Sequence, residues 1–260
     1  MNLRLQASGR EGYEVIIDNH EALKYINHFG ILRLVERRSF SDHTDSCEAL
    51  LHVIEGSCTI NVNGEPFAEL GSRATPYEGR PAAVYLPPGV DFTVEGEGVE
   101  IAITRSHAEA NGEPQLIAPE SLQPKQAGKD NWARTVTMIA PPDYPAQKLI
   151  LGETVNPPGN WSGVPTHKHD SHAAGEESMH EELYYFRVDR PGGWGIERVY
   201  DKNGLDEVLL LQDRVVTLKP RGFHTVSAAP GYTLYYAFML AGPSKKLIAR
   251  LDPDQAWIAD

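Results

Sequence analysis

Short apolar runs separated by polar turns recur along the whole chain, and few segments keep a helical period. The runs are bounded by Gly, Pro, Asp and Asn and follow one another every 8–15 residues or so, which is typical of β-sandwiches and barrels. Helical candidates are confined to residues 21–27 and 254–258. The pattern predicts an all-β protein with strands at residues 31–35, 50–54, 58–62, 83–86, 99–104, 135–139, 148–154, 183–188, 195–200, 208–211, 215–218 and 233–239.

A polar segment separates two strand-rich halves. Residues 107–134 contain prolines and few β-branched residues, a composition typical of a connection. We therefore expect a first barrel domain at residues 1–115, a linker at 116–134 and a second barrel domain at 135–260.

The two halves repeat a pattern of polar residues. A Pro-x-Gly turn precedes Asp91 in the first half and His224 in the second, 133 positions later. Upstream of each turn, a group of polar residues precedes an apolar strand: His43, Asp45 and Glu48 in the first half, and His167, His169 and Glu182 in the second. One insertion of about ten residues after His169 accounts for the difference in spacing. A duplicated barrel is the simplest explanation.

The second half carries the residues of a metal site. His167 and His169 are two apart, so on a strand both imidazoles project from one face. Glu182 opens the next strand, and His224 follows a turn that leads into another. Three imidazoles and one carboxylate suit a divalent transition ion. We expect these four residues to bind one ion.

Other acidic and histidine residues surround this pattern. Glu177 and Glu181 are alternatives to Glu182, which is preferred because it lies in phase with Tyr184 at the strand entry. His172 and His180, in the insertion, are expected to face solvent or to cover the site as part of a lid.

The first half lacks this nitrogen-rich set. Its corresponding positions are His43, Asp45, Glu48 and Asp91, of which three are acidic. Since a transition metal prefers imidazole to carboxylate, we expect a structural barrel there and assign it no metal.

Charge and composition exclude several classes of protein. The net charge of −12 and the sequence pI near 5.3 disfavour nucleic-acid binding, because such a surface repels phosphate. Two cysteines provide no disulfide framework, and the sequence shows neither a signal peptide nor an apolar stretch of membrane-spanning length. We expect a cytoplasmic protein that binds neither nucleic acid nor membrane.

The order His-x-His, Glu, Pro-x-Gly-x-His resembles the metal signature of the cupins, which are jelly-roll β-barrels. The second half is more specifically similar to the 5-deoxy-glucuronate isomerases of inositol catabolism. The similar stretches are residues 159–170 (GNWSGVPTHKHD), 181–187 (EELYYFR), 195–200 (GIERVY), 220–224 (PRGFH), 228–232 (AAPGY), 235–236 (YY) and 252–257 (DPDQAW). The gap between His169 and Glu182 is longer than in most cupins. The resemblance implies two tandem cupin-type jelly-roll barrels, a bicupin.

The resemblance implies an aldose–ketose isomerase that converts 5-deoxy-glucuronate to 5-dehydro-2-deoxy-gluconate. That reaction needs a Lewis acid, a proton carrier and a cation for the substrate carboxylate. Zn²⁺ or Mn²⁺ is the preferred ion, with Fe²⁺ or Ni²⁺ possible. The candidate proton carriers are Tyr184 and Tyr236. The candidate partners of the carboxylate are Arg221, Arg187 and Arg198.

Three other functions share these residues. A ketol-isomerase of pectin degradation, acting on 5-dehydro-4-deoxy-glucuronate, uses similar chemistry. A bicupin dioxygenase would consume oxygen, whereas a non-enzymatic cupin would bind the sugar acid unchanged. The sequence leaves monomer and homo-oligomer equally open.

Overall fold

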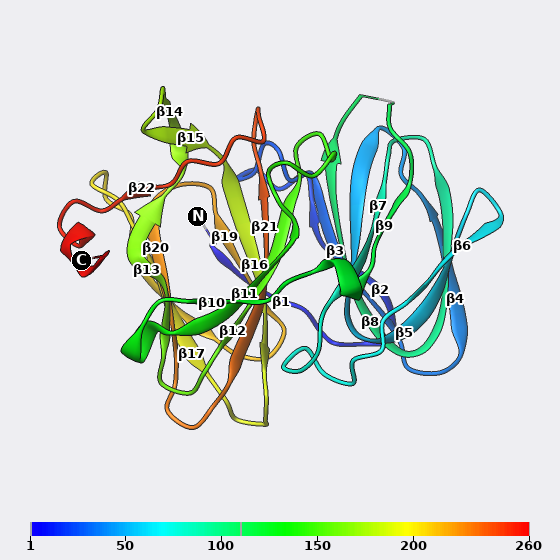
Figure 1. Ribbon diagram of the computed structural model, residues 1–260, viewed down its shortest axis with the longest axis horizontal. Helices are drawn as coiled ribbons and strands as arrows, with labels where there is room; N and C mark the ends of the chain where they lie inside the picture. Colours follow the sequence, from blue (N-terminus) through cyan, green and yellow to red (C-terminus); the bar gives the residue numbers. More distant parts are fainter. Residues whose placement is uncertain (1, 110, 260) are drawn as a thin grey trace.

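The apolar runs of the first half form one sheet that curls on itself. The computed structural model describes residues 2–109 and 111–259, and Figure 1 shows two barrels side by side. The first barrel has the strand order β2-β3-β8-β5-β7-β9, with β4 paired to β8 and β6 to β5. Its strands are β2 (Gly12–Asp18), β3 (His28–Leu34), β4 (Arg38–His43), β5 (Cys47–Val62), β6 (Glu65–Leu70), β7 (Ala82–Leu86), β8 (Asp91–His107) and β9 (Gln115–Ile117).

Two long strands close this barrel by bending. The register between β5 and β8 shifts on both sides of Glu55, so each strand serves two faces of the barrel. Gly56 stands at the bend with φ of 83°. A β-carbon there would lie 2.2 Å from the carbonyl oxygen of Gly98, so only glycine lets the strands approach so closely.

The second barrel consists of two facing sheets. The first sheet has the order β1-β19-β16-β21-β12-β11-β10, and the second has the order β18-β17-β20-β13-β22. Their strands are β1 (Arg4–Gln6), β10 (Lys125–Ala127), β11 (Arg134–Ala140), β12 (Ile150–Asn156), β13 (Trp161–Lys168), β16 (Glu181–Val188), β17 (Gly195–Tyr200), β18 (Asp206–Leu211), β19 (Val215–Lys219), β20 (Phe223–Ala228), β21 (Leu234–Ala241) and β22 (Arg250–Leu251).

The remaining elements are short. The strands β14 (Asp170–Ala173) and β15 (Glu177–Met179) form a hairpin in the insertion after the His-x-His pair. Within the described residues there are three 3-10 helices: η1 (Pro119–Ser121), η2 (Asp130–Trp132) and η3 (Ala256–Ala259). Among the described residues, no helix is long and apolar enough to span a membrane.

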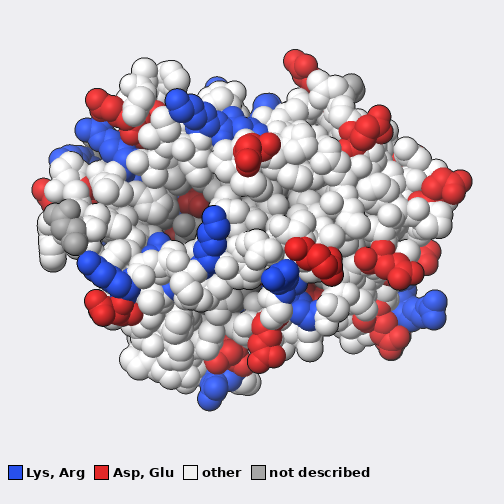
Figure 2. Space-filling model, viewed as in Figure 1, with Lys and Arg blue, Asp and Glu red and all other residues white. Residues whose placement is uncertain are grey.

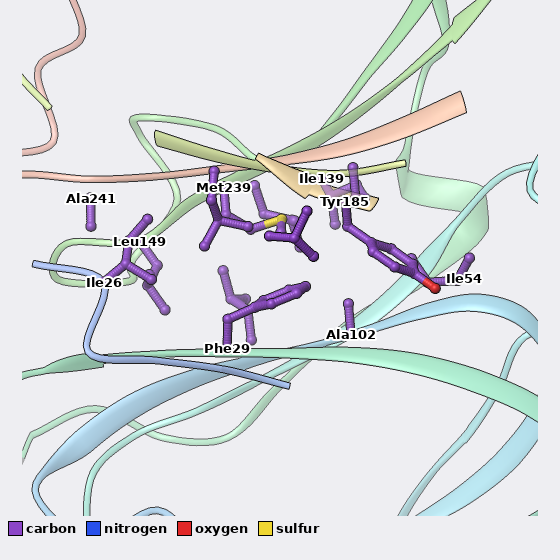
Figure 3. Close-up of a cluster of buried hydrophobic side chains, with 14 of the residues drawn as sticks. Ile26, Phe29, Ile54, Ala102, Ile139, Leu149, Tyr185, Met239 and Ala241 are labelled. Atoms are coloured by element: carbon purple, nitrogen blue, oxygen red, sulfur yellow. The ribbon is translucent and has the colours of Figure 1, made fainter. Parts of the chain in front are cut away.

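Strand alternation sorts the apolar side chains into three cores. The inward residues of each barrel form one cluster. A third cluster lies between the barrels, where the outward residues of the first barrel pack against the outward residues of the second. Figure 3 shows this third cluster, in which Phe29 and Ala102 of the first barrel face Met239 and Tyr185 of the second. The apolar interface holds the two barrels together.

Two buried glutamates connect the barrels reciprocally. Glu48 of the first barrel accepts hydrogen bonds from the backbone N–H groups of residues 147–149, at 2.6 to 2.9 Å. Glu181 of the second barrel accepts bonds from the N–H groups of residues 24–26. The structural counterpart of Glu48 is therefore Glu181, also 133 positions later, and the alignment of Glu48 with Glu182 is wrong by one residue.

Two expectations about connecting segments change. Residues 21–27 are not helical, because the N–H groups of residues 24–26 bond to Glu181 instead of to helical carbonyls. The segment expected to be a linker supplies strands to both barrels: β9 pairs with β7, and β10 pairs with β11. The N-terminal β1 joins the second barrel through β19. The domain boundaries at 115 and 135 stay a prediction.

Candidate metal centre

The histidine pattern converges inside the second barrel. His167 on β13 lies directly opposite His224 on β20 in the strand register. The potential ligand atoms of His167, His169 and His224 all lie within 4.8 Å of one another. Among the residues that the structure describes, this is the one such cluster of three or more metal-ligating side chains.

Glu182 reaches the cluster from the facing sheet. Its Oε2 lies 3.1 Å from Nε2 of His224 and 3.5 Å from Nε2 of His169. Neither Glu177 nor Glu181 competes, because Glu177 bonds to Lys168 and to the β14 backbone, and Glu181 faces the first barrel. The in-phase choice of Glu182 therefore agrees with the side-chain placement.

The backbone orients all three imidazoles. Each Nδ1–H donates to a carbonyl oxygen: that of Pro165 for His167, of His180 for His169 and of Gly222 for His224, at 3.2, 3.1 and 3.4 Å. Because Nδ1 carries the proton, each Nε2 has a free lone pair, which is directed toward the centre of the cluster. A hydrogen bond from Nδ1–H to a backbone carbonyl fixes the tautomer that a metal-ligating histidine needs.

The electrostatics favour the forms that bind a cation. Burial, together with the neighbouring His224 and His169, lowers the pKa of His167 to about 3, so this imidazole is neutral at physiological pH. Burial raises the pKa of Glu182, but the adjacent imidazoles of His169 and His224 lower it by more, so its net pKa falls well below the usual value. The centre therefore offers a neutral imidazole at His167 beside the ionised carboxylate of Glu182.

Two orphaned atoms show that these residues fit a metal ion. Oε2 of Glu182 and Nε2 of His224 are buried without a hydrogen-bond partner. Leaving such atoms unpaired costs about 1–3 kcal/mol each, and a bound cation would satisfy both. The donor set of three nitrogens and one oxygen matches a divalent transition ion.

The first barrel does not repeat this set. His43 lies opposite Asp91 in the β4–β8 register, as His167 lies opposite His224. However, the position equivalent to Glu182 is Ala49, because Glu48 faces the second barrel. The side chains of His43 and Asp45 are 42% and 79% exposed, which does not give the enclosed ligand cage of the second barrel.

The two candidate tyrosines lie inside the second barrel. The rings of Tyr184 and Tyr236 are 4.5 Å apart, and Tyr184 is 6.0 Å from the His224 ring. The hydroxyl of Tyr236 donates to Oγ of Ser162 at 2.9 Å. Burial raises the pKa of both phenols, so both are neutral proton donors at physiological pH.

The structure does not bring the three candidate arginines to the histidines. Arg187 lies on the opposite face of β16 from Glu182 and pairs with Glu100 of the first barrel at 2.7 Å. Arg198 pairs with Asp206 on the exposed side of β17 and β18. Arg221 is half exposed and pairs with Asp201, whose side chain is largely buried. Each cation already has a carboxylate partner away from the cluster.

Sequence reasoning missed a buried ion pair beside the centre. Lys219 lies opposite Glu182 in the β16–β19 register. Its Nζ is 3.2 Å from Glu197 and 3.2 Å from the ring centroid of Tyr184. The sequence does contain a signal for this pair. Lys219 lies two positions after Thr217 on an otherwise apolar strand, so the two side chains share one face.

The two insertion histidines differ in environment. His180 is fully buried, and its carbonyl oxygen holds His169, so it supports the site and does not face solvent. His172 is exposed on β14. Of the two expectations, solvent exposure or a lid over the site, the first describes its position. Figure 2 shows a hollow over the second barrel, with acidic atoms at its base and basic side chains at its rim.

Comparisons with known proteins identify close relatives of this chain. The model of the KduI/IolB family matches residues 3–258. The 5-deoxy-glucuronate isomerase of Geobacillus thermodenitrificans is 32% identical over 235 residues, which are 89% of this chain and 86% of that protein. An IolB-like protein from Salmonella typhimurium has a TM-score of 0.95 at 29% identity, with both chains covered completely.

A more distant structure confirms the fold. The oxalate decarboxylase of Bacillus subtilis, a protein with Mn(II) centres, has a TM-score of 0.68 at 12% identity and covers 96% of this chain and 79% of its own. At that identity the likeness concerns the fold alone. It confirms the predicted pair of cupin-type jelly-roll barrels.

Proposed function

The chain belongs to the KduI/IolB family, and from this we propose that it converts 5-deoxy-glucuronate to 5-dehydro-2-deoxy-gluconate in inositol catabolism. The reaction is an aldose–ketose isomerisation. The observation that carries the proposal is the buried cluster of three histidines and Glu182 in a chain 32% identical to a 5-deoxy-glucuronate isomerase.

We propose that His167, His169, Glu182 and His224 hold one divalent ion, with Zn²⁺ or Mn²⁺ preferred over Fe²⁺ or Ni²⁺. Such an ion would supply Lewis acidity to polarise the carbonyl and the adjacent hydroxyl of the sugar acid. The backbone carbonyls at Nδ1 keep each histidine in the tautomer that the ion needs.

The two tyrosines beside the cluster are placed to donate hydrogen bonds or to position a donor. Isomerisation moves one proton between neighbouring carbons through an enediolate, and it needs hydrogen bonds to the oxygens on which charge develops. Tyr184 lies against His224, and its raised pKa keeps its hydroxyl protonated. We propose that Tyr184 donates to a substrate oxygen, whereas Tyr236, bonded to Ser162, holds the ring of Tyr184 in place.

Proton NMR in D₂O tests this proposal directly. Metal-loaded protein is expected to convert 5-deoxy-glucuronate to the 2-deoxy-5-keto acid, and chelated protein is expected to leave the spectrum unchanged. Deuterium in the product would report exchange of the transferred proton with solvent. An unchanged spectrum with protein shown to contain metal would contradict the proposed substrate.

The same sample separates the other functions. Oxygen uptake during turnover would identify a dioxygenase, whereas an isomerase consumes none. Conversion of 5-dehydro-4-deoxy-glucuronate in place of the inositol-derived acid would identify the pectin-degrading activity.

A further inference from the structure

A sugar acid presents two ends that a metal centre can bind. Its carboxylate is itself a good ligand for a divalent ion, so the acid could bind with the wrong end at the histidines. A cation elsewhere in the barrel would remove this ambiguity by binding the carboxylate. Arg187, Arg198 and Arg221 are committed to other carboxylates.

Arg134 begins β11 on the face that lines the second barrel. Tyr236 lies opposite Thr154 on β12, and Thr154 lies opposite Val136 on β11. Residues two apart on a strand share a face, so Arg134 projects to the same side as Val136. The other face of this sheet is the inter-barrel one, where Glu153 bonds to Arg73 of the first barrel.

The guanidinium of Arg134 is free of acidic partners. In the part of the chain that the structure describes, Arg134 forms no salt bridge, and its one side-chain hydrogen bond runs to the carbonyl oxygen of Trp132, at 3.3 Å. The group also lies 5.7 Å from the ring centroid of Trp132. Most of its N–H groups therefore remain available to a ligand.

The local backbone makes room for this guanidinium. Gly128 has φ of 77°, and a β-carbon there would lie 2.7 Å from Nη1 of Arg134 and 2.3 Å from the carbonyl oxygen of Trp132. Any other residue at position 128 would therefore displace the guanidinium or strain the turn. The turn at residues 128–132 and the Trp132 ring together hold the side chain in a fixed position.

The charge of Arg134 acts on the barrel interior. Burial raises the pKa of Tyr236, and Arg134 is one of the groups that lower it in part. Tyr236 stacks on Tyr184, which in turn lies against His224. By strand phase, Arg134, Tyr236 and Glu182 project from the same face of this sheet, toward the barrel interior.

We propose that Arg134 binds the carboxylate of the sugar acid and so directs the aldehyde end toward the histidines. The inference rests on the proposed function and adds the residue that sets substrate orientation. A guanidinium can bind a carboxylate through two parallel N–H···O bonds, which fix direction as well as position. A neutral sugar would lack this contact.

Paired substrates test the role of Arg134. Arg134→Met is expected to lower kcat/KM for 5-deoxy-glucuronate about 100-fold, mainly through KM, because charged hydrogen bonds are lost. On the C6 amide of the same sugar, kcat/KM of Arg134→Met should be within about twofold of the wild-type value. Arg134→Lys should restore part of the loss, since it keeps the charge but not the fork. Arg190→Met, at an exposed turn, is the matched control and should leave both substrates unaffected.

Equal loss on acid and amide, or no loss on either, would overturn the assignment. Calorimetry with D-glucuronate and D-glucose decides the inference independently of turnover. Wild type should bind glucuronate at least about 10-fold more tightly than Arg134→Met does, with equal glucose binding. Equal glucuronate affinities would overturn the inference, whereas failure of wild type to isomerise the acid would overturn only the proposed function.

Discussion

His224→Ala and Glu182→Gln are each expected to reduce turnover of 5-deoxy-glucuronate below about 1% of wild type, because each removes a proposed metal ligand. Metal affinity should fall by at least about 100-fold, more than the loss of an outer-shell contact causes. Activity and bound metal, measured by plasma emission spectroscopy on dialysed protein, check the prediction together. Thermal unfolding of the same samples shows whether each variant remains folded.

Asp91→Ala is the matched control. Asp91 holds the strand position in the first barrel that His224 holds in the second, yet no carboxylate equivalent to Glu182 faces it. We expect metal content and turnover to remain within about twofold of wild type. If Asp91→Ala abolished activity and His224→Ala preserved it, the assignment of the working barrel would be wrong.

Arg73→Met is expected to destabilise the protein by about 3–5 kcal/mol, because it leaves a buried carboxylate without its cation. Arg73 donates two hydrogen bonds, at 2.9 and 2.8 Å, to Glu153 of the other barrel. Nε2 of His52 and the hydroxyl of Tyr235 also lie 3.3 and 3.0 Å from the same carboxylate oxygen. Urea unfolding at neutral pH measures the loss.

The pH dependence of stability provides a second readout of the same pair. Burial raises the pKa of Glu153, but the charge of Arg73 and the adjacent imidazole of His52 lower it by more, to about 2. A depressed folded-state pKa contributes stability that is present above the unfolded value of 4.5 and lost as pH falls toward 2. In Arg73→Met, the part of this acid dependence that is due to Glu153 should weaken.

A double variant separates the ion pair from simple packing. Arg73→Met combined with Glu153→Met replaces the pair by apolar side chains, and we expect it to recover much of the lost stability. If the double variant lost as much stability as the sum of its single changes, the unpaired charge would not explain the single-variant result.

The sequence was sufficient to predict the second barrel and the convergence of three of its histidines. His167, His169 and His224 converge because two-residue spacing and a Pro-x-Gly turn have direct geometric consequences on strands. Glu182 could be selected over Glu181 for the same reason, since strand phase places it with Tyr184. These inferences needed only local geometry.

The sequence was insufficient wherever a contact joins the two barrels. Nothing near Glu48 or Glu181 indicates that each caps backbone N–H groups about 100 or more residues away, so Glu48 was aligned one residue out of register. Arg187 resembled a substrate ligand for the same reason: its partner, Glu100, lies in the other barrel. Arg134 was overlooked because it falls at the end of the segment interpreted as a linker.

Anomalous diffraction from crystals of the metal-loaded protein is the most direct test of the central claim, that one metal ion lies in the second barrel. Data collected above and below the absorption edge of the loaded metal should give one peak among His167, His169, Glu182 and His224, with no peak beside His43 and Asp91. A peak in the first barrel, or none at the histidine cluster of fully active crystals, would contradict the account.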